Sequence, residues 1–394
     1  MIKNFEKIKS ELIKSGIWTA ILTVFFLTIS WSKSSIFIIF SGLIYFILLY
    51  FLFFSIGKEE VSKWLRSFIK NDIKKAVLFP SFLIVLYYSY IIINGHNPFK
   101  GTVFLLPYLI YFPTLIFVAK NNISKKIDWL DFTTLVLFLL PITLVEFLPN
   151  TELPFGGNGF DSVYRLVLIL AVVYAFVVIR DIKDVGFFPL IKSKYLGIAI
   201  ATWLAFYAFV YIIGNSVDFI EYVGHDKAFF TLLTSIGMSI LGVFLHTAIF
   251  EELFFRGLLQ NMLAKRISQE ISWKPAWKWG AVLLVVISLL TGYAMDGNLQ
   301  WFPGLITLFL FLAAYGVEQS GISIKGTYTA LAITSVIFGL VHFHSGSIIF
   351  VGLASIGGWA YGYTYIKTKN VFYAALVHAL VNSSHLIFGL ELMK

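Results

Sequence analysis

The chain has 394 residues, of which 59% are hydrophobic and 13% charged, with a mean hydropathy of +0.85. Soluble domains carry about 25% charged residues, so this chain has too few polar side chains to cover a water-facing surface, and a soluble globule is excluded. It has no cysteine, which excludes disulfides and cysteine-ligated zinc.

Apolar blocks of about 18–22 residues follow one another along the chain, each long enough to cross the hydrocarbon core of a bilayer as a helix. We therefore predict an all-α polytopic integral membrane protein with about 13 transmembrane helices. The expected spans lie near residues 17–31, 36–56, 76–94, 102–119, 130–148, 163–179, 195–214, 229–250, 279–294, 302–315, 328–343, 347–364 and 370–390.

Two segments of the N-terminal half carry basic residues next to apolar ones. Met1–Gly16 is Lys-rich and is predicted to be a retained, amphipathic lead-in to the first span. Val61–Ala76 places Trp64 and Phe68 among Lys and Arg residues. It is either a basic helix lying at the membrane interface or an ordinary orienting loop, and the sequence favours neither.

Charge alternates between successive loops. Most Lys and Arg residues lie in every second loop, whereas Pro149–Ser162 and Asn215–Asp226 lean acidic. By the positive-inside rule the N-terminus is cytoplasmic and the C-terminus lies outside. The net charge of +9 comes mainly from Lys and Arg residues in the loops that set the orientation of the chain in the membrane. It therefore does not predict a nucleic-acid partner.

The first polar cluster inside a span contains Glu251, Glu252 and Arg256 and continues the apolar segment that begins near Phe229. Ionisable side chains at this depth cost about 2.5–3.5 kcal/mol on insertion, so they mark functional candidates. On a helix, Glu252 and Arg256 can pair on one face, whereas Glu251 points about 100° away and finds no local partner. An unpaired, partly buried glutamate suits a general acid or base. The alternative is a helix end at the cytoplasmic interface.

Two further clusters lie in later spans. His342 comes late in an apolar segment, one turn after Phe338, and the alternative role is a core histidine bonded to a backbone carbonyl. His378 and Asn382 are four residues apart in the last span, where the alternative is polar contact between helices. Together the three clusters suit a buried hydrolytic site, in which a carboxylate activates water. Two histidines and one glutamate also form a reasonable zinc set.

At these residues the chain resembles the CPBP family of intramembrane proteases, the CAAX-protease and bacteriocin-processing group. The family motifs EExxxR, FxxxH and HxxxN/D read here, in family order, as Glu251-Glu252…Arg256, Phe338…His342 and His378…Asn382. The stretch Gly352–Tyr363 also resembles the family and has the small-residue spacing of closely packed helices.

The resemblance implies an endopeptidase in which a glutamate and histidines converge in a membrane cavity. Glu251 would be the catalytic carboxylate, and Glu252 and Arg256 would support it. His342, His378 and Asn382 would polarise water or stabilise an oxyanion. No cofactor is certain, because the resemblance leaves open whether glutamate alone activates the water or zinc takes part. Glu251, His342 and His378 are the candidate zinc ligands.

The resemblance covers roughly Leu190–Leu390, so we predict two parts. Residues 1–185 form an N-terminal transmembrane extension of about six spans. Residues 186–394 form the CPBP-like core, with an inserted hairpin near 279–316. The predicted topology places Glu251 and His342 near opposite membrane faces, about 20 Å apart. A shared site therefore requires the Glu251 helix to continue through Leu258–Leu263, or the His342 helix to tilt or re-enter.

We predict an intramembrane endopeptidase that hydrolyses a peptide bond in a membrane-associated peptide or protein, in a bacterial cell membrane. Prenyl-CAAX processing is one option, but a Lys-, Ile- and Asn-rich chain without cysteine favours bacterial peptide maturation or self-immunity. One rival is a scaffold that regulates a partner membrane protein or a cell-wall enzyme. A second is a transporter with Glu and His as a proton relay, which predicts an internal repeat that the sequence does not show.

Overall fold

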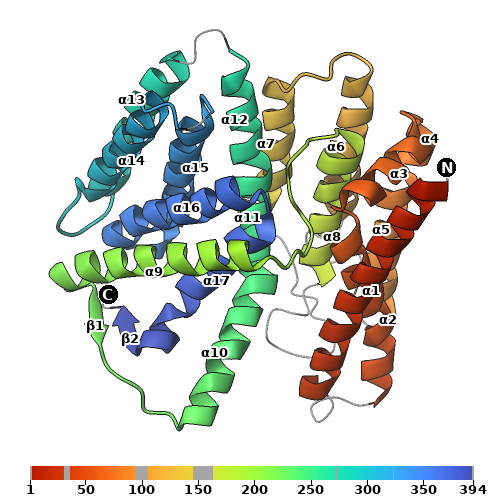
Figure 1. The fold of residues 1–394 in the computed structure, drawn as a ribbon, viewed down its shortest axis with the longest axis horizontal. Helices are drawn as coiled ribbons and strands as arrows, with labels where there is room; N and C mark the ends of the chain where they lie inside the picture. Colours follow the sequence, from red (N-terminus) through yellow and green to blue (C-terminus); the bar gives the residue numbers. More distant parts are fainter. Residues whose placement is uncertain are drawn as a thin grey trace. The chain divides into compact units, whose positions relative to one another are not determined.

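A computed structural model describes residues 2–30, 36–93, 97, 105–144, 163–270, 274–322 and 324–392. The described chain is helical apart from its loops and two strands of three residues each, and it divides into two compact units, Met1–Pro189 and Leu190–Lys394 (Figure 1). The all-α prediction is confirmed. The expected acidic loop Pro149–Ser162 lies outside the described residues.

Membrane-spanning helices are present in both units. Among the described residues, seven helices are long and apolar enough to cross a bilayer, or eight if the bent pair Gly42–Ser55 and Glu59–Ile69 is one span. The chain is therefore an integral membrane protein. Other apolar helices are shorter, at Trp129–Leu140, Val163–Ile179 and Trp277–Tyr293. The number of spans predicted from the sequence is consequently not confirmed.

Unit 1 is a set of helices, most of them apolar. They are α1 (Ile2–Ser30), α2 (Ile36–Ser55), α3 (Glu59–Ile69), α4 (Ile73–Ala76), α5 (Leu78–Ile93), α6 (Leu106–Asn121), α7 (Trp129–Leu144), α8 (Val163–Val173) and the π-helical η2 (Tyr174–Ile179). The segment Val61–Ala76, predicted as a helix or a loop, contains most of α3, a turn and then α4, and α3 turns by 96° from α2. Trp64 and Phe68 are exposed on α3. Its place at the membrane surface stays a prediction.

A buried charge cluster ties three elements of unit 1 together. Asp131 of α7 is fully buried and pairs with Lys120 Nζ of α6 at 2.6 Å and with Arg180 Nε, just after η2, at 2.6 Å. Arg180 also donates to the backbone carbonyl of Lys126. Breaking a buried pair leaves an uncompensated charge, so this cluster holds α6, α7 and η2 in one arrangement.

Unit 2 contains all three sequence clusters. Its elements are α9 (Ser193–Ser216), β1 (Ile220–Tyr222), α10 (Phe229–Val243), the π-helical η3 (Phe244–Ala248), α11 (Ile249–Glu252), the π-helical η4 (Leu253–Gln260), α12 (Asn261–Ser268), α13 (Lys274–Tyr293), α14 (Phe302–Gln319), α15 (Thr327–Val341), the 3₁₀ turn η5 (His342–Ser345), α16 (Ile348–Thr368), α17 (Val371–Phe388) and β2 (Leu390–Leu392). The strands β1 and β2 pair antiparallel, with Glu221 opposite Glu391.

One continuous helix of 40 residues, Phe229–Ser268, runs from α10 through α12 (Figure 1). The sequence boundary near residue 250 was therefore wrong. Arg256, Gln260 and Asn261 are polar enough to suggest a helix end, but neighbouring helices bury all three. Glu251 consequently lies near the middle of the helix and not at its end. The π-helical turns η3 and η4 flank Glu251, and such turns occur frequently at functional sites.

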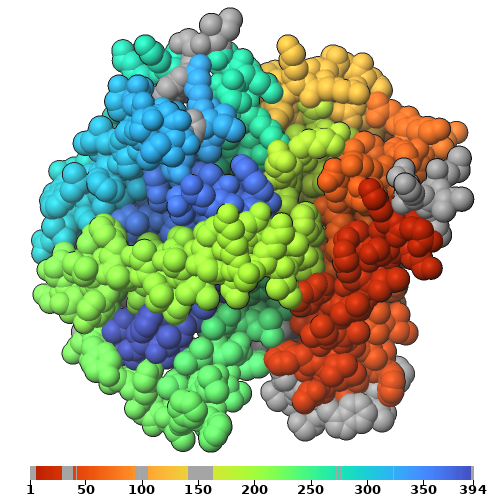
Figure 2. Space-filling view, in the orientation of Figure 1, coloured from red at the N-terminus to blue at the C-terminus, as the bar shows by residue number. Residues whose placement is uncertain are grey.

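Glycines allow the helices of unit 2 to approach closely. A Cβ added at Gly339 of α15 would lie 2.6 Å from the Val351 carbonyl oxygen of α16. A Cβ at Gly362 would lie 2.5 Å from Gln260 Oε1 of η4. Helix α9 lies across α16 and α17 in the space-filling view (Figure 2), and Trp203 Nε1 of α9 donates to Ser384 Oγ of α17. The small-residue spacing therefore serves close packing, as predicted.

We predict that Gly339→Ala destabilises the protein by about 1–3 kcal/mol, because the methyl group would overpack the contact between α15 and α16. Gly316→Ala on α14 is the matched control, since a Cβ there meets nothing within 4 Å. The control should gain about 0.5–1 kcal/mol from helix propensity. Thermal unfolding in detergent measures both, and equal midpoints for the two variants would contradict the close contact.

Candidate active site

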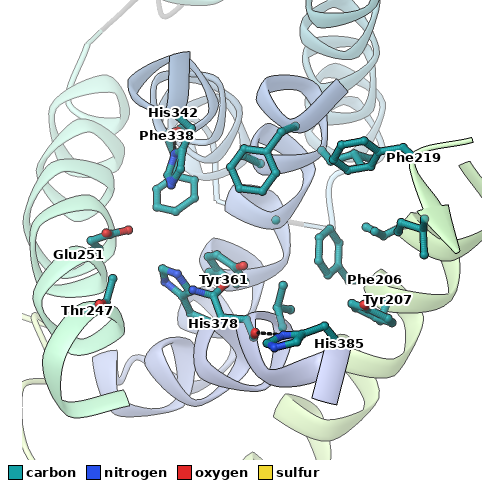
Figure 3. Close-up of a pocket in the computed structure, with 18 residues that line it drawn as sticks. Phe206, Tyr207, Phe219, Thr247, Glu251, Phe338, His342, Tyr361, His378 and His385 are labelled. Atoms are coloured by element: carbon teal, nitrogen blue, oxygen red, sulfur yellow. Dashed lines mark hydrogen bonds between the residues drawn. The ribbon is translucent and has the colours of Figure 1, made fainter. Parts of the chain in front are cut away.

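A cavity of about 340 Å³ lies within unit 2 and brings the three clusters together (Figure 3). Six elements contribute to its wall: α9, β1, the Glu251 helix, α15 with η5, α16 and α17. The lining residues with polar side chains are Tyr207, Thr247, Glu251, His342, Tyr361, His378, Asn382 and His385. Its size lies at the lower end of the range for small-ligand sites.

Behind the cavity wall, Glu252 is bonded through both carboxylate oxygens. Arg256 Nε donates to Oε2 at 3.0 Å, and His378 Nδ1 lies 2.9 Å from Oε1. All three side chains are nearly or fully buried. The predicted pairing of Glu252 with Arg256 at a spacing of four residues is confirmed. The bond to His378 joins the first motif helix to the last.

The ring of His378 is held in one orientation. Because a carboxylate only accepts hydrogen bonds, His378 Nδ1 carries the proton and Nε2 is the nitrogen left for the cavity. The Tyr361 ring stacks on His378, with centroids 4.6 Å apart and planes at 7°. Phe338 meets the same ring edge-on at 5.7 Å. The guanidinium of Arg256 in turn lies 5.3 Å from the Phe338 centroid.

Glu251 faces the cavity from the opposite side to His378 (Figure 3). Its Oε2 atom is buried, and no hydrogen-bond partner for this atom exists among the described residues. Buried polar atoms nearly always have a partner, so an orphaned carboxylate oxygen in a cavity indicates a ligand or a water. The sequence expectation that Glu251 lacks a local partner is confirmed for Oε2.

His342 is bonded to a backbone carbonyl and also lines the cavity. Its Nδ1 lies 2.7 Å from the Phe338 carbonyl oxygen, and the two rings lie 4.7 Å apart. A carbonyl only accepts, so Nδ1 carries the proton and the lone pair of neutral His342 is on Nε2. His342 can therefore bond a backbone carbonyl through Nδ1, as a core histidine would, and still face the cavity as a functional residue. A shared site required the Glu251 helix to continue through Leu258–Leu263, and it does so. Glu251 and His342 consequently line one cavity.

The last motif is on one face of α17. His378 and Asn382 both line the cavity, with His378 buried and Asn382 exposed at the rim. His385 follows one turn later and donates through Nδ1 to the Asn382 carbonyl oxygen at 2.9 Å (Figure 3). Asn382 lines the same cavity as His378, and a side-chain amide offers both a donor and an acceptor.

The other end of the cavity is apolar and aromatic. Phe206, Tyr207 and Phe219 come from α9 and the start of β1, and Phe350 comes from α16. Figure 3 shows the first three of these on the side of the cavity away from Glu251. The cavity therefore has a polar end with ionisable groups and an aromatic end.

Across the described residues, no three His, Asp or Glu side chains are grouped as a metal ion requires. The candidate zinc set of Glu251, His342 and His378 shares the cavity but does not form such a group. The arrangement of these described residues therefore does not fit a bound metal.

The structure brings Glu251, His342, His378 and Asn382 to one cavity and places Glu252 and Arg256 directly behind it. Sequence reasoning missed the residues that complete the wall, namely Thr247, Tyr361, His385 and the aromatic residues of α9 and β1. Thr247 lies four residues before Glu251, a spacing that could have suggested it. Tyr361 lies in the glycine-rich stretch, which was assigned to packing alone.

Residues 233–324 and 317–384 match the model of the family described as Type II CAAX prenyl endopeptidase Rce1-like. The resemblance to the CPBP family is confirmed for this part of unit 2, and the matched family is one of membrane endopeptidases. No curated protein and no solved structure matches the chain.

We predict that the two adjacent glutamates differ in their effect on stability. Glu252→Gln removes the charge that balances the fully buried Arg256, so unfolding free energy should fall by about 3–5 kcal/mol. Glu251→Gln breaks no hydrogen bond at Oε2 and should leave the unfolding midpoint unchanged. Thermal unfolding of both purified variants tests this, and an equal loss in both would contradict the distinct surroundings.

Proposed function

We propose that unit 2 hydrolyses a peptide bond in a membrane-associated peptide or protein, using a water molecule activated by Glu251. The observation that carries this proposal is the unpartnered Glu251 oxygen in a cavity shared with His342, His378 and Asn382. A carboxylate, two histidines and an amide suit amide hydrolysis, which needs a base and oxyanion donors.

In the proposed first step, water lies between Glu251 and His342. The lone pair of His342 Nε2 accepts a hydrogen bond from the water and orients it, since its Nδ1 proton is committed to the Phe338 carbonyl. Glu251 takes one proton from the water as the oxygen attacks the carbonyl carbon of the substrate. A general base in this position contributes a factor of about 10²–10⁴ in rate.

The negative charge then moves from Glu251 to the oxygen of the tetrahedral intermediate. His378 and the Asn382 amide face that oxygen. With Glu252 ionised, a doubly protonated His378 can donate Nδ1–H to Glu252 and Nε2–H to the oxyanion. Glu252 and the oxyanion then balance Arg256 and His378 in charge. Protonated Glu251 finally gives its proton to the leaving amine, so that one water is consumed and two chain ends are released.

The substrate is proposed to enter with apolar residues in the aromatic end of the cavity. Phe206, Phe219 and Phe350 offer no charge for a polar side chain there. This suits a membrane-associated peptide and is compatible with both prenyl-CAAX processing and bacterial peptide maturation. We further propose that residues 1–185 act as a transmembrane extension of this core, that the α13–α14 hairpin is an insertion in it, and that the N-terminus is cytoplasmic.

We predict that purified protein cleaves at least one peptide of a quenched-fluorescence panel of apolar, membrane-associated sequences. Glu251→Gln and His342→Ala should each reduce kcat by about 10²–10⁴-fold, because each removes a group that activates the water. Asn382→Ala should reduce kcat by about 10²–10³-fold, the usual loss for one oxyanion donor. Product masses identify the cleaved bond.

Two controls accompany this experiment. Gly316→Ala should cleave at the wild-type rate, because it changes an open helix face in the same unit. Treatment with a chelator should leave activity unchanged, and a loss restored by zinc would contradict the metal-free step. If neither wild type nor any variant cleaves the panel, the scaffold alternative is favoured and co-purifying partners become the object of study.

A further inference from the structure

Tyr361 of α16 is a buried cavity residue that the steps above do not use. Its side chain lines the cavity and is 3% exposed. Among the described residues, its hydroxyl has no hydrogen-bond partner. A tyrosine hydroxyl can both donate and accept a hydrogen bond. The open hydrogen bond of Tyr361 is therefore available to a molecule in the cavity.

The hydroxyl lies between the polar and the aromatic ends. A Cβ added at Gly357, one turn earlier on α16, would be 3.2 Å from the Tyr361 hydroxyl oxygen and 3.4 Å from Phe206 Cζ. The missing side chain at Gly357 thus leaves space above the hydroxyl. Figure 3 shows Tyr361 between His378 and Phe206.

The ring of Tyr361 is fixed against the same histidine that faces the reacting carbonyl. It stacks on His378 at 4.6 Å and meets Phe338 at right angles at 5.7 Å. These contacts hold the hydroxyl at a constant position relative to His378. A fixed donor loses little side-chain entropy on binding, which makes its hydrogen bond more effective.

Resting on the proposed function, we propose that Tyr361 is a substrate-contacting residue. Its hydroxyl donates a hydrogen bond to a backbone carbonyl oxygen of the bound peptide, on the side of the scissile bond that occupies the aromatic end. Successive residues of an extended peptide are about 3.3 Å apart. A peptide whose scissile carbonyl faces His378 therefore presents further carbonyls along the aromatic end, where the phenylalanines offer no donor and Tyr207 is the other hydroxyl.

Tyr361→Phe tests the proposal, because it keeps the ring and its stacking and removes only the hydroxyl. With the panel peptide that the wild type cleaves, kcat/KM should fall about two- to tenfold, as for one neutral hydrogen bond. The loss should appear mainly in KM, since the contact exists in both the bound substrate and the transition state. The unfolding midpoint should not change.

Tyr373→Phe on α17 is the matched control. Its hydroxyl bonds the backbone of Lys192, accepting from N at 2.8 Å and donating to O at 3.2 Å, and it does not line the cavity. This variant should lose stability and keep the wild-type kcat/KM. Tyr361→Phe is therefore expected to lower kcat/KM and keep stability, whereas Tyr373→Phe is expected to lower stability and keep kcat/KM.

The proposal is overturned if Tyr361→Phe cleaves like the wild type while Tyr361→Leu loses activity, because the ring alone would then matter. Failure of the proposed function is distinguished by Glu251→Gln, which would then cleave normally. A binding measurement further separates failure of the Tyr361 proposal from failure of the proposed function. In the Glu251→Gln protein, adding Tyr361→Phe should weaken binding of the uncleaved peptide by the same two- to tenfold factor.

Discussion

Arg256 and His378 share the two oxygens of one buried carboxylate, that of Glu252. Each of these groups would be costly to bury alone, and together they satisfy one another. The arrangement joins the Glu251 helix to α17 and fixes the tautomer of His378. It also determines the role of the neighbouring residue: with Glu252 committed to the helix contact, Glu251 points into the cavity, where its Oε2 has no partner among the described side chains.

The depth of the site depends on helix length and on glycine. A helix of 40 residues places Glu251 far from either of its ends. His342 stands where the short α15 ends, and α15 reaches that position by packing closely on α16 at Gly339. Helix α16 carries Tyr361 to the face of His378, and α9 supplies the aromatic end. Together with α17 and β1, these helices form a cavity that is polar at one end and aromatic at the other.

The membrane fold could be predicted because composition and block length depend directly on the solvent that the chain must face. The pairing of Glu252 with Arg256 followed from helical spacing, and the motif residues from their order along the chain. The position of Glu251 near the middle of a long helix could not be predicted from composition or spacing. Gln260 and Asn261 suggest a helix end, and only the packing of other helices around them shows that they are buried. The roles of Tyr361 and Phe206 in the wall likewise depend on contacts between distant segments, which no local pattern reports.

The central claim is that water attacks the peptide carbonyl directly, with Glu251 as its base. A single turnover of the wild-type protein in water enriched with oxygen-18, followed by mass spectrometry, tests this most directly. Direct attack by water places one heavy oxygen in the new carboxyl end of the product and none in the protein. Heavy oxygen in the side chain of Glu251, together with an unlabelled product, would show that Glu251 attacks the carbonyl itself and would contradict the account.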